Sequence, residues 1–250
     1  MASKLILYGD MMSQPVRAVR FMLLNHKIPH VFKAVKIASL EHLSDEYKRM
    51  YDQSKYIYIY LSNQSIEIKL TLLNCIYCSN PLHLIPALQD GDLTLVESHT
   101  IMRYIAQKYK LDQLYSTTDL IQRCKVDMYL DWHHLGLRKA STMVFFSKFV
   151  APRIGRAVNQ AALDMEIMNL QTSLSKFESI WLGDKKFIVG DRPTLADYSA
   201  FTEISNLRFV PVEFFDLSKF PKIDAWLKRF ESFDGYEESH LIFKKVLSKL

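Results

Sequence analysis

Strand-like and helix-like segments alternate over residues 4–109, and only helical patterns follow from Leu120 to the end of the chain. The apolar run Lys4–Tyr8 predicts a buried strand, and the alternation at Val31–Ile37 predicts a second one. Between them, Pro15 opens a helical pattern, because proline is tolerated in the first turn of a helix. The sequence therefore predicts a small α/β domain with a mixed sheet, followed by an all-helical domain.

A hairpin and a helix mark the end of the first domain. The apolar runs Ile85–Leu88 and Leu93–Val96 flank an Asp-Gly pair, which is a hairpin signal. Ser98 then precedes a helical pattern and is the predicted N-cap. A polar stretch without periodicity follows this helix and predicts a linker. The predicted units are residues 1–109, the linker 110–119 and residues 120–250.

Composition and charge exclude several classes of function. The net charge of +5 is mild and no Lys/Arg block of the nucleic-acid-binding type is present, so no nucleic-acid partner is expected. No apolar run is long enough to span a bilayer, and the N-terminal one is too short for a secretory leader. The three cysteines, an odd number, make no disulfide framework. These features predict a soluble, cytoplasmic protein without a membrane partner.

Two predicted helix starts are candidates for anion binding. Ser13 lies at a strand-to-helix turn, and Glu97-Ser98 begins a later helix. Backbone N–H groups and the helix dipole favour an anion at such positions. A cis bond between Ile85 and Pro86 would turn the Ile85 backbone outward, where it can pair with a peptide-like ligand.

The order of these groups resembles that of the cytosolic glutathione S-transferase family, and it is most similar to the theta class. The theta-class signature Ser-Gln-Pro-x-Arg-Ala-Val is met in full by Ser13–Val19. Further family motifs follow in order over almost the whole chain, apart from residues 51–79. One match would be weak evidence, but the ordered set is specific. The other matching motifs are Asn80–Leu82, Ile85–Leu88, Asp90–Asp92, Glu97-Ser98, Trp132–His134, Arg138 and Thr194–Asp197.

The resemblance implies a thioredoxin-like N-terminal domain, an all-helical C-terminal domain that carries the electrophile site, and a homodimer. It implies glutathione as co-substrate and no bound cofactor. In the implied reaction, enzyme-bound glutathione thiolate attacks an electrophile such as an alkyl or aralkyl halide, an epoxide or an organic peroxide. The alternative is a non-catalytic protein of the same fold that binds a ligand or a partner.

Ser13 matches the catalytic serine of the theta class. Its hydroxyl would donate a hydrogen bond to the glutathione sulfur, and a bond to a charged group is worth about 1.5–3 kcal/mol. Such a bond lowers the pKa of the thiol by about one to two units from roughly 8.5. Ser13 is thus implied to stabilise the nucleophile, while the simpler interpretation is that it only caps its helix.

Other positions match glutathione contacts of the family. Glu97-Ser98 matches the pair that holds the γ-glutamyl end, and Ile85-Pro86 matches the segment whose backbone pairs with the cysteinyl part. His42 matches a histidine near the glycyl carboxylate. The family often has a lysine two residues before the proline, and this chain has Leu84 there, so one contact to the glycyl end is absent.

The helical domain supplies candidates of several kinds. Arg138 matches an arginine that faces the active site in theta-class enzymes, with a surface ion pair as the simpler interpretation. Thr194 and Asp197 have the spacing of a capping box and are predicted to be structural. His133 and His134 are adjacent and point to different sides of a helix, so no metal site is predicted. The wall of the electrophile site, or else part of the core, is predicted to contain Met143, Phe145, Phe146 and Phe149.

Residues 51–79 have no counterpart in the family pattern. The runs Tyr56–Leu61 and Ser65–Leu72 alternate and predict a β-hairpin. Cys75 and Cys78 form a lone Cys-x-x-Cys, without the second pair that a structural zinc site needs. One interpretation is therefore a lineage-specific hairpin insertion.

The other interpretation, which we adopt as a hypothesis, is a translated, unspliced intron. The 29 residues contain no Gly, Pro, Ala, Val or Arg and are rich in residues with A/T-rich codons. The Met50-Tyr51 junction must be encoded with a GT, and an AG ends the segment if Ser79 has an AGY codon. Excision from that GT through that AG keeps the reading frame. It joins Arg49 through an isoleucine codon to Asn80.

Overall fold

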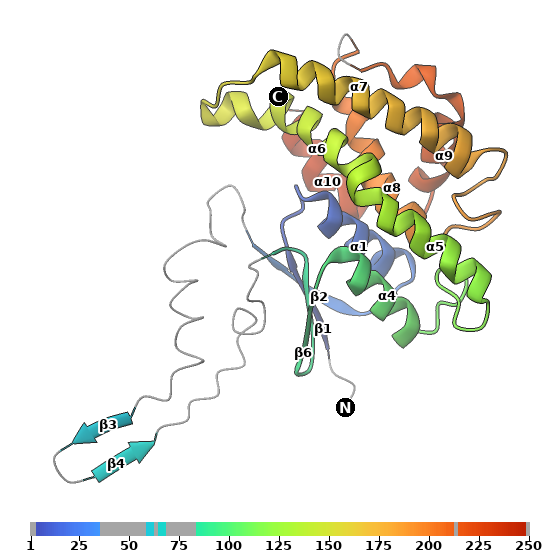
Figure 1. The fold of residues 1–250 in the computed structure, drawn as a ribbon. Helices are drawn as coiled ribbons and strands as arrows, with labels where there is room; N and C mark the ends of the chain where they lie inside the picture. Colours follow the sequence, from blue (N-terminus) through green and yellow to red (C-terminus); the bar gives the residue numbers. More distant parts are fainter. Residues whose placement is uncertain (1–3, 36–58, 63–64, 69–83, 213–214, 249–250) are drawn as a thin grey trace.

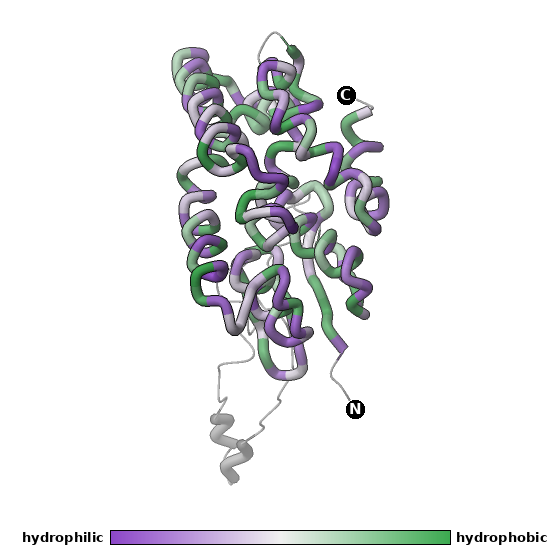
Figure 2. Tube along the Cα trace, turned by 90° about the vertical axis from the view of Figure 1, so that its right-hand side faces the viewer, coloured by the Kyte–Doolittle hydropathy of each residue, from purple (hydrophilic) through white to green (hydrophobic). Residues whose placement is uncertain are grey.

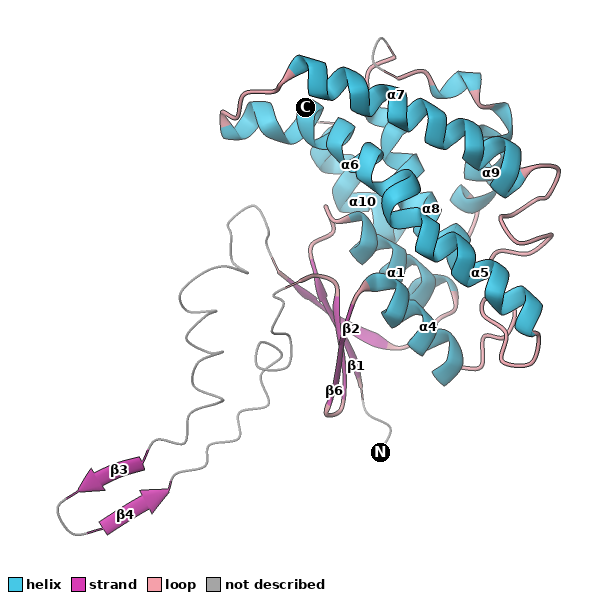
Figure 3. Cartoon of the chain, viewed as in Figure 1, coloured by secondary structure: helices cyan, strands magenta, loops and turns pink. Residues whose placement is uncertain are grey.

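The computed structural model describes residues 4–35, 59–62, 65–68, 84–212 and 215–248 (Figure 1). A small sheet lies at one end, the helices of the second half of the chain lie at the other, and α1 and α4 lie between them. Figure 3 shows the same separation of strands from helices. His42, a predicted contact to glutathione, lies outside the described residues.

The sheet of the first domain is mixed, as the sequence predicts. Its strand order is β2-β1-β5-β6. β1 pairs in parallel with β2, which lies at one edge of this order, while β5 is antiparallel to both β1 and β6. Because parallel neighbours need a crossover, α1 connects β1 to β2. The strands are β1 (Leu5–Gly9), β2 (His30–Ala34), β5 (Ala87–Asp90) and β6 (Leu93–Val96).

Two predicted strands are displaced by a few residues. The second strand begins at His30 and ends at Ala34, so it starts one residue early and stops short of the predicted end. The strand predicted at Ile85–Leu88 begins instead at Ala87. Pro86 has no N–H group to donate to a ladder, which explains why pairing starts after it.

Each of the two helices that the structure describes in the first domain buries about half of its residues or more. Helix α1 (Gln14–Asn25) carries Pro15 in its first turn, and helix α4 (Ser98–Lys108) begins directly after Glu97. Their buried residues recur at helical spacing, which is why each helix can pack against the sheet and the second domain at once.

Residues 110–119 form neither helix nor strand. Leu114 and Tyr115 are nevertheless buried, and the Leu114 carbonyl accepts a hydrogen bond from the Leu195 N–H at 3.3 Å. The predicted linker is therefore packed against the second domain at its middle.

Helices make up the second domain. A π-helical turn at His134–Arg138 joins α5 to α6, and Asp119 caps α5 by accepting a hydrogen bond from the Gln122 N–H. In Figure 2, hydrophilic and hydrophobic residues alternate along the outer helices, as amphipathic packing requires. The helices are α5 (Leu120–His133), α6 (Lys139–Phe145), α7 (Gln160–Lys176), α8 (Leu195–Ile204), α9 (Pro221–Glu231) and α10 (Tyr236–Leu247).

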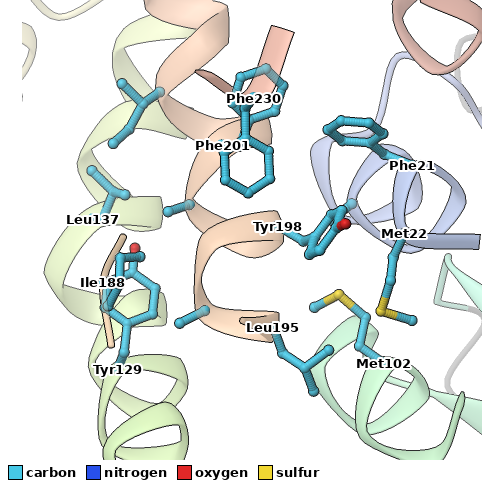
Figure 4. Packing of buried hydrophobic residues seen from close by; sticks show 14 of the residues in the cluster. Phe21, Met22, Met102, Tyr129, Leu137, Ile188, Leu195, Tyr198, Phe201 and Phe230 are labelled. Atoms are coloured by element: carbon cyan, nitrogen blue, oxygen red, sulfur yellow. The ribbon is translucent and has the colours of Figure 1, made fainter. Parts of the chain in front are cut away.

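Helix α8 is the centre of the core. Every residue of α8 is buried, and a helix that is buried all round belongs in the interior of a domain. Figure 4 shows α8 between Tyr129 of α5 and Met22 of α1, with Tyr198 of α8 on the side of Met22. The rings of Phe21 and Phe201 lie 5.6 Å apart, centroid to centroid. The same hydrophobic core therefore joins the two domains.

Part of the segment 51–79 is described. Strands β3 (Ile59–Ser62) and β4 (Ser65–Ile68) pair antiparallel, which confirms the predicted hairpin. Cys75 and Cys78 lie outside the described residues. Because alternating residues form such a ladder whatever their origin, the hairpin favours neither interpretation of the segment.

No helix in the part of the chain that the structure describes is both long and apolar enough to cross a bilayer.

Candidate functional site

A pocket of about 180 Å³ lies where the two domains meet. It draws together the Ile85-Pro86 turn, the start of α4, the end of α5 and one face of α8. Ile85, Pro86, Glu97, Ser98 and Arg138, all predicted site residues, line it. Residues that the sequence did not single out for a ligand also line it: His99, Ser199, Thr202 and Glu203, together with His133 and His134.

The start of α4 forms one wall of this pocket. Ser98 is the first helical residue and is buried, while the N-cap is Glu97. The predicted cap at Ser98 is thus wrong by one residue. Glu97 is exposed and has a φ of 68°, a backbone region that costs a non-glycine residue about 1–3 kcal/mol. Residues held in such a conformation cluster at ligand sites.

The Ile85-Pro86 peptide bond is cis. Ile85 is half-buried and Pro86 is buried, and both line the pocket directly before β5 begins. The structure therefore contains the cis bond on which the predicted pairing of the Ile85 backbone with a ligand depends.

Ser13 is the N-cap residue of α1, in extended conformation, but its side chain makes no capping hydrogen bond. Its N–H donates to the Asp10 carbonyl at 2.9 Å, which closes the turn after β1. Ser13 does not line the pocket described above, although Pro15, two residues further on, does. Ser13 is half-buried, and its hydroxyl is not used to cap the helix.

A group of histidines lines the inner end of the pocket. His99 Nε2 lies 2.7 Å from Ser199 Oγ, and the His99 ring centroid lies 4.5 Å from that of His134 and 5.3 Å from that of His133. Burial, followed by the nearby His134, Arg103 and Arg138, lowers the pKa of His99 to about 3. Burial also lowers the pKa of His133 well below its ordinary value. His99 and His133 are thus polar and uncharged at neutral pH.

The described residues contain no group of three or more His, Cys, Asp or Glu side chains arranged to hold a metal ion.

Arg138 forms an ion pair with Glu203 across the pocket wall. The Glu203 side chain is only 2% exposed and also accepts a hydrogen bond from Ser141 Oγ at 2.8 Å. Because one partner is buried, the pair is not the surface ion pair that is the simpler interpretation of Arg138. It fixes a guanidinium beside the polar end of the pocket.

Asp197 makes the predicted capping box at the start of α8. Its Oδ2 accepts hydrogen bonds from the Thr194 N–H at 2.8 Å and from Thr194 Oγ1 at 2.9 Å. Its Oδ1 accepts bonds from the Ile188 N–H at 2.9 Å and from Trp226 Nε1 at 3.1 Å. Burial nevertheless raises the pKa of Asp197 to about 6. The carboxyl joins the α8 start to α9 and the preceding loop.

The predicted apolar wall divides into two parts. Phe145 packs with Phe243 and Leu247, and Phe149 and Met12 lie against this cluster. Met143 is 44% exposed, and Phe146 is half-buried with Arg156 over its ring. Because Met12 directly precedes Ser13, the cluster lies beside the loop that carries this serine.

Comparison with known proteins agrees with this arrangement. Family models match at residues 76–107, "Glutathione S-transferase, N-terminal domain", and at residues 160–229, "Glutathione S-transferase, C-terminal domain". The first match begins inside the segment 51–79. Mouse glutathione S-transferase theta-1 is 31% identical over 96% of this chain and 89% of its own length.

Solved structures match over the same extent. Human glutathione transferase theta-2 in complex with glutathione superposes with a TM-score of 0.79 at 28% identity, over 98% of this chain and 89% of that one. A human theta-class transferase in complex with the glutathione conjugate of 1-menaphthyl sulfate gives the same TM-score, identity and coverage. The fold is thus a thioredoxin-like domain followed by a helical domain, and the chain belongs to the glutathione S-transferase family, among relatives of the theta class.

Proposed function

We propose that Ser13 activates the glutathione of this glutathione transferase by donating a hydrogen bond from its hydroxyl to the thiolate. One observation carries this proposal: Ser13 occupies the N-cap position of α1 without using its hydroxyl as a cap. The helix dipole at that end favours an anion. A hydrogen bond to a charged sulfur, worth about 1.5–3 kcal/mol, would lower the pKa of the bound thiol by about one to two units.

The pocket supports the proposed contacts to glutathione. The N-terminus of α4 offers the Ser98 hydroxyl and backbone N–H groups to the γ-glutamyl carboxylate, and the exposed Glu97 carboxylate offers an acceptor to the γ-glutamyl ammonium. The Ile85 backbone, before Pro86, would pair with the cysteinyl part. His42 stays a proposed contact to the glycyl carboxylate, and Leu84 leaves that end with one contact fewer.

The electrophile would approach from the helical domain. Met12 and Phe149, half-buried against the cluster of Phe145 and Phe243, offer an apolar surface next to Ser13. Arg138 offers a cation to a polar or anionic leaving group. In the reaction, the sulfur electron pair forms a bond to the electrophilic carbon, and the leaving group departs with the electrons of the bond that breaks. A related human enzyme has been solved with the glutathione conjugate of 1-menaphthyl sulfate, which favours aralkyl substrates as the first class to test.

A non-catalytic binding role is not favoured. The relatives that match over nearly the whole chain are glutathione S-transferases by name, and the Ser13 motif is intact.

We also propose a homodimer, with a second copy of this chain packed on the outer face of α5. Ile121 is 68% exposed, Met128 is 58% exposed and Leu135, just after α5, is 83% exposed. Their spacing of seven residues places them along one side of the helix. Such an apolar stripe on a surface is typical of an interface. Replacing Met128 with Glu is expected to shift the molar mass measured by light scattering from that of two chains to that of one.

A cytosolic location stays a proposal. The thiol of Cys124 is exposed and free, which is the state that a reducing compartment maintains.

The deciding experiment measures glutathione conjugation to alkyl and aralkyl halides, with and without residues 51–79, in wild type and in Ser13→Ala. We expect turnover that Ser13→Ala lowers by about 10- to 100-fold at pH 6.5, the range that corresponds to one to two pKa units. Ser179→Ala, the same change on an exposed helix surface, is the matched control. Glutathione binding without turnover in the form that lacks residues 51–79 would refute the catalytic proposal.

A further inference from the structure

Arg17 in α1 is a fully buried cation, with no exposed surface. Arginine is rarely buried completely unless its charge and its donors are matched. Burial lowers the pKa of Arg17 to about 9, while nearby Glu203 and Asp10 raise it and Arg138 lowers it. Because burial of a charge is unfavourable, the groups that Arg17 contacts indicate its role.

The guanidinium holds the loop that precedes Ser13. Arg17 NH1 donates hydrogen bonds to the Met11 carbonyl at 2.9 Å and to the Met12 carbonyl at 3.0 Å. The other side of the loop is closed by Asp10, whose carboxylate accepts from the Met12 N–H at 2.9 Å. The Asp10 carbonyl accepts from the Ser13 N–H at 2.9 Å. The backbone directly before Ser13 is therefore bonded on both sides.

The same guanidinium is anchored in the helical domain. Arg17 NH2 donates to Asn206 Oδ1 at 2.6 Å, just after α8. The guanidinium carbon also lies 3.9 Å from the centroid of the Phe243 ring on α10. Arg17 thus connects the loop to the helical domain, where its partner Asn206 lies 189 residues further along the chain.

We infer that Arg17 is a positioning residue for Ser13, and that Asn206 and Phe243 of the helical domain set its position. The inference rests on the proposed role of Ser13. A hydroxyl that moves by about 1 Å from its productive position can lose about 10²-fold in rate. Two hydrogen bonds to the carbonyls before Ser13 remove that freedom, and the anchors in α10 and after α8 keep the guanidinium in register. The packing of the helical domain therefore determines how well Ser13, in the first domain, is placed to donate its hydrogen bond to the glutathione sulfur.

The test uses a pair of substitutions at Asn206. Asn206→Leu removes the acceptor for Arg17 at similar volume, while Asn206→Asp retains an oxygen in the same place. The full-length enzyme is saturated with glutathione, and the absorbance of the bound thiolate is titrated with pH. For Asn206→Leu we expect the pKa of the bound thiol to rise by about half to one unit. At pH 6.5 kcat/KM is expected to fall by about 3- to 10-fold, with the KM for glutathione changed by less than about twofold. Asn206→Asp is expected to restore the wild-type titration.

A matched control separates positioning from stability. Tyr198 OH donates to Asn25 Oδ1 at 2.6 Å, so Asn25→Leu removes a bond of the same length between the domains, at the opposite end of α1 from Ser13. It is expected to lower Tm without changing the pKa of the bound thiol. The groups that face Arg17 and titrate or carry charge are Asp10, Glu203, Arg138 and His240, and none of them is altered by these variants.

The inference is overturned if Asn206→Leu lowers Tm but titrates like wild type. Hydrogen exchange of the amides at residues 10–13 gives a second measurement that does not depend on activity. Faster exchange there in Asn206→Leu, with unchanged exchange in β5, would show that Arg17 holds this loop. This result would stand even if the wild-type enzyme formed no thiolate. That absence of thiolate would reject the proposed role of Ser13, and unchanged exchange at residues 10–13 would reject the role of Arg17.

Discussion

His99 on α4 and Ser199 on α8 share a hydrogen bond of 2.7 Å that crosses the boundary between the two domains. The histidine is neutral because burial, aided by the nearby His134, Arg103 and Arg138, lowers its pKa to about 3. In the unfolded chain its pKa returns to about 6.5. Between these values the unfolded state binds a proton that the folded state does not, so stability rises with pH over this range and is lost as pH falls.

The first prediction concerns His99→Gln. For wild type, His99 alone should lower the free energy of unfolding by about 2 kcal/mol between pH 7 and pH 5. The variant should lose that part of the pH dependence. Urea denaturation at the two pH values measures it, with His30→Gln, on β2 and outside this pocket, as the control. An unchanged pH dependence in His99→Gln would mean that folding does not shift the pKa of this imidazole, which contradicts the lowered pKa.

The second prediction concerns the ion pair of Arg138 and Glu203. Arg138→Ala leaves a buried carboxylate without its cation, which should cost about 3–5 kcal/mol in the free energy of unfolding. The double variant Arg138→Ala/Glu203→Gln removes the orphaned charge and should regain a large part of this loss. Denaturant unfolding of the two variants measures the difference. Equal stability of the single and double variants would mean that Glu203 is not ionised in the fold.

The third prediction concerns the capping carboxyl of Asp197. Asp197→Asn places an amide nitrogen where Thr194 presents two donors, so we expect a loss of about 2–4 kcal/mol at pH 7. Asp191→Asn, the same change on an exposed loop, should stay within about 0.5 kcal/mol. Thermal unfolding compares the two.

The pH dependence of Asp197 has the opposite sign to that of His99. Its folded pKa of about 6 lies above the unfolded value of 3.8, so its contribution is full below pH 3.8 and is lost as pH rises through 6. The difference in the free energy of unfolding between wild type and Asp197→Asn should therefore become smaller as pH rises. A gap in stability that widens from pH 5 to pH 7 would contradict the raised pKa.

The fourth prediction concerns residues 51–79. If they are a translated intron, the functional transcript joins Arg49 through isoleucine to Asn80. Sequencing of the transcripts, together with tryptic peptide mapping of the native protein, provides the measurement. Detection of the peptide Tyr56–Lys69 in native protein would reject the intron hypothesis and leave the hairpin insertion.

Local signals predicted the elements that depend on neighbouring residues. The Pro15 helix start, the β5–β6 hairpin around Gly91 and the Thr194–Asp197 box are each determined within a few residues. The strand boundary after Pro86 was missed by two residues, because the missing N–H of proline outweighed the apolar pattern. Glu97, at a φ of 68°, takes the cap position that its own side chain does not favour.

Contacts between elements that are far apart in the sequence could not be predicted in the same way. Ser199, Glu203 and Asn206 are polar and buried, and their partners lie on α4, α5–α6 and α1. A signal was nevertheless present, since these polar residues recur every three or four positions along a helix that is otherwise apolar. The spacing shows a polar stripe facing one way, but only the fold shows what it faces.

The contact between Arg17 and Asn206 also has a consequence for biosynthesis. The loop that carries Ser13 is translated well before Asn206, which follows Arg17 by 189 residues, and before Phe243. A nascent chain therefore has the residues of the loop before Ser13 long before it has the partners that hold this loop in place. A product truncated before Asn206 would carry an intact signature at Ser13–Val19 with the loop unsupported.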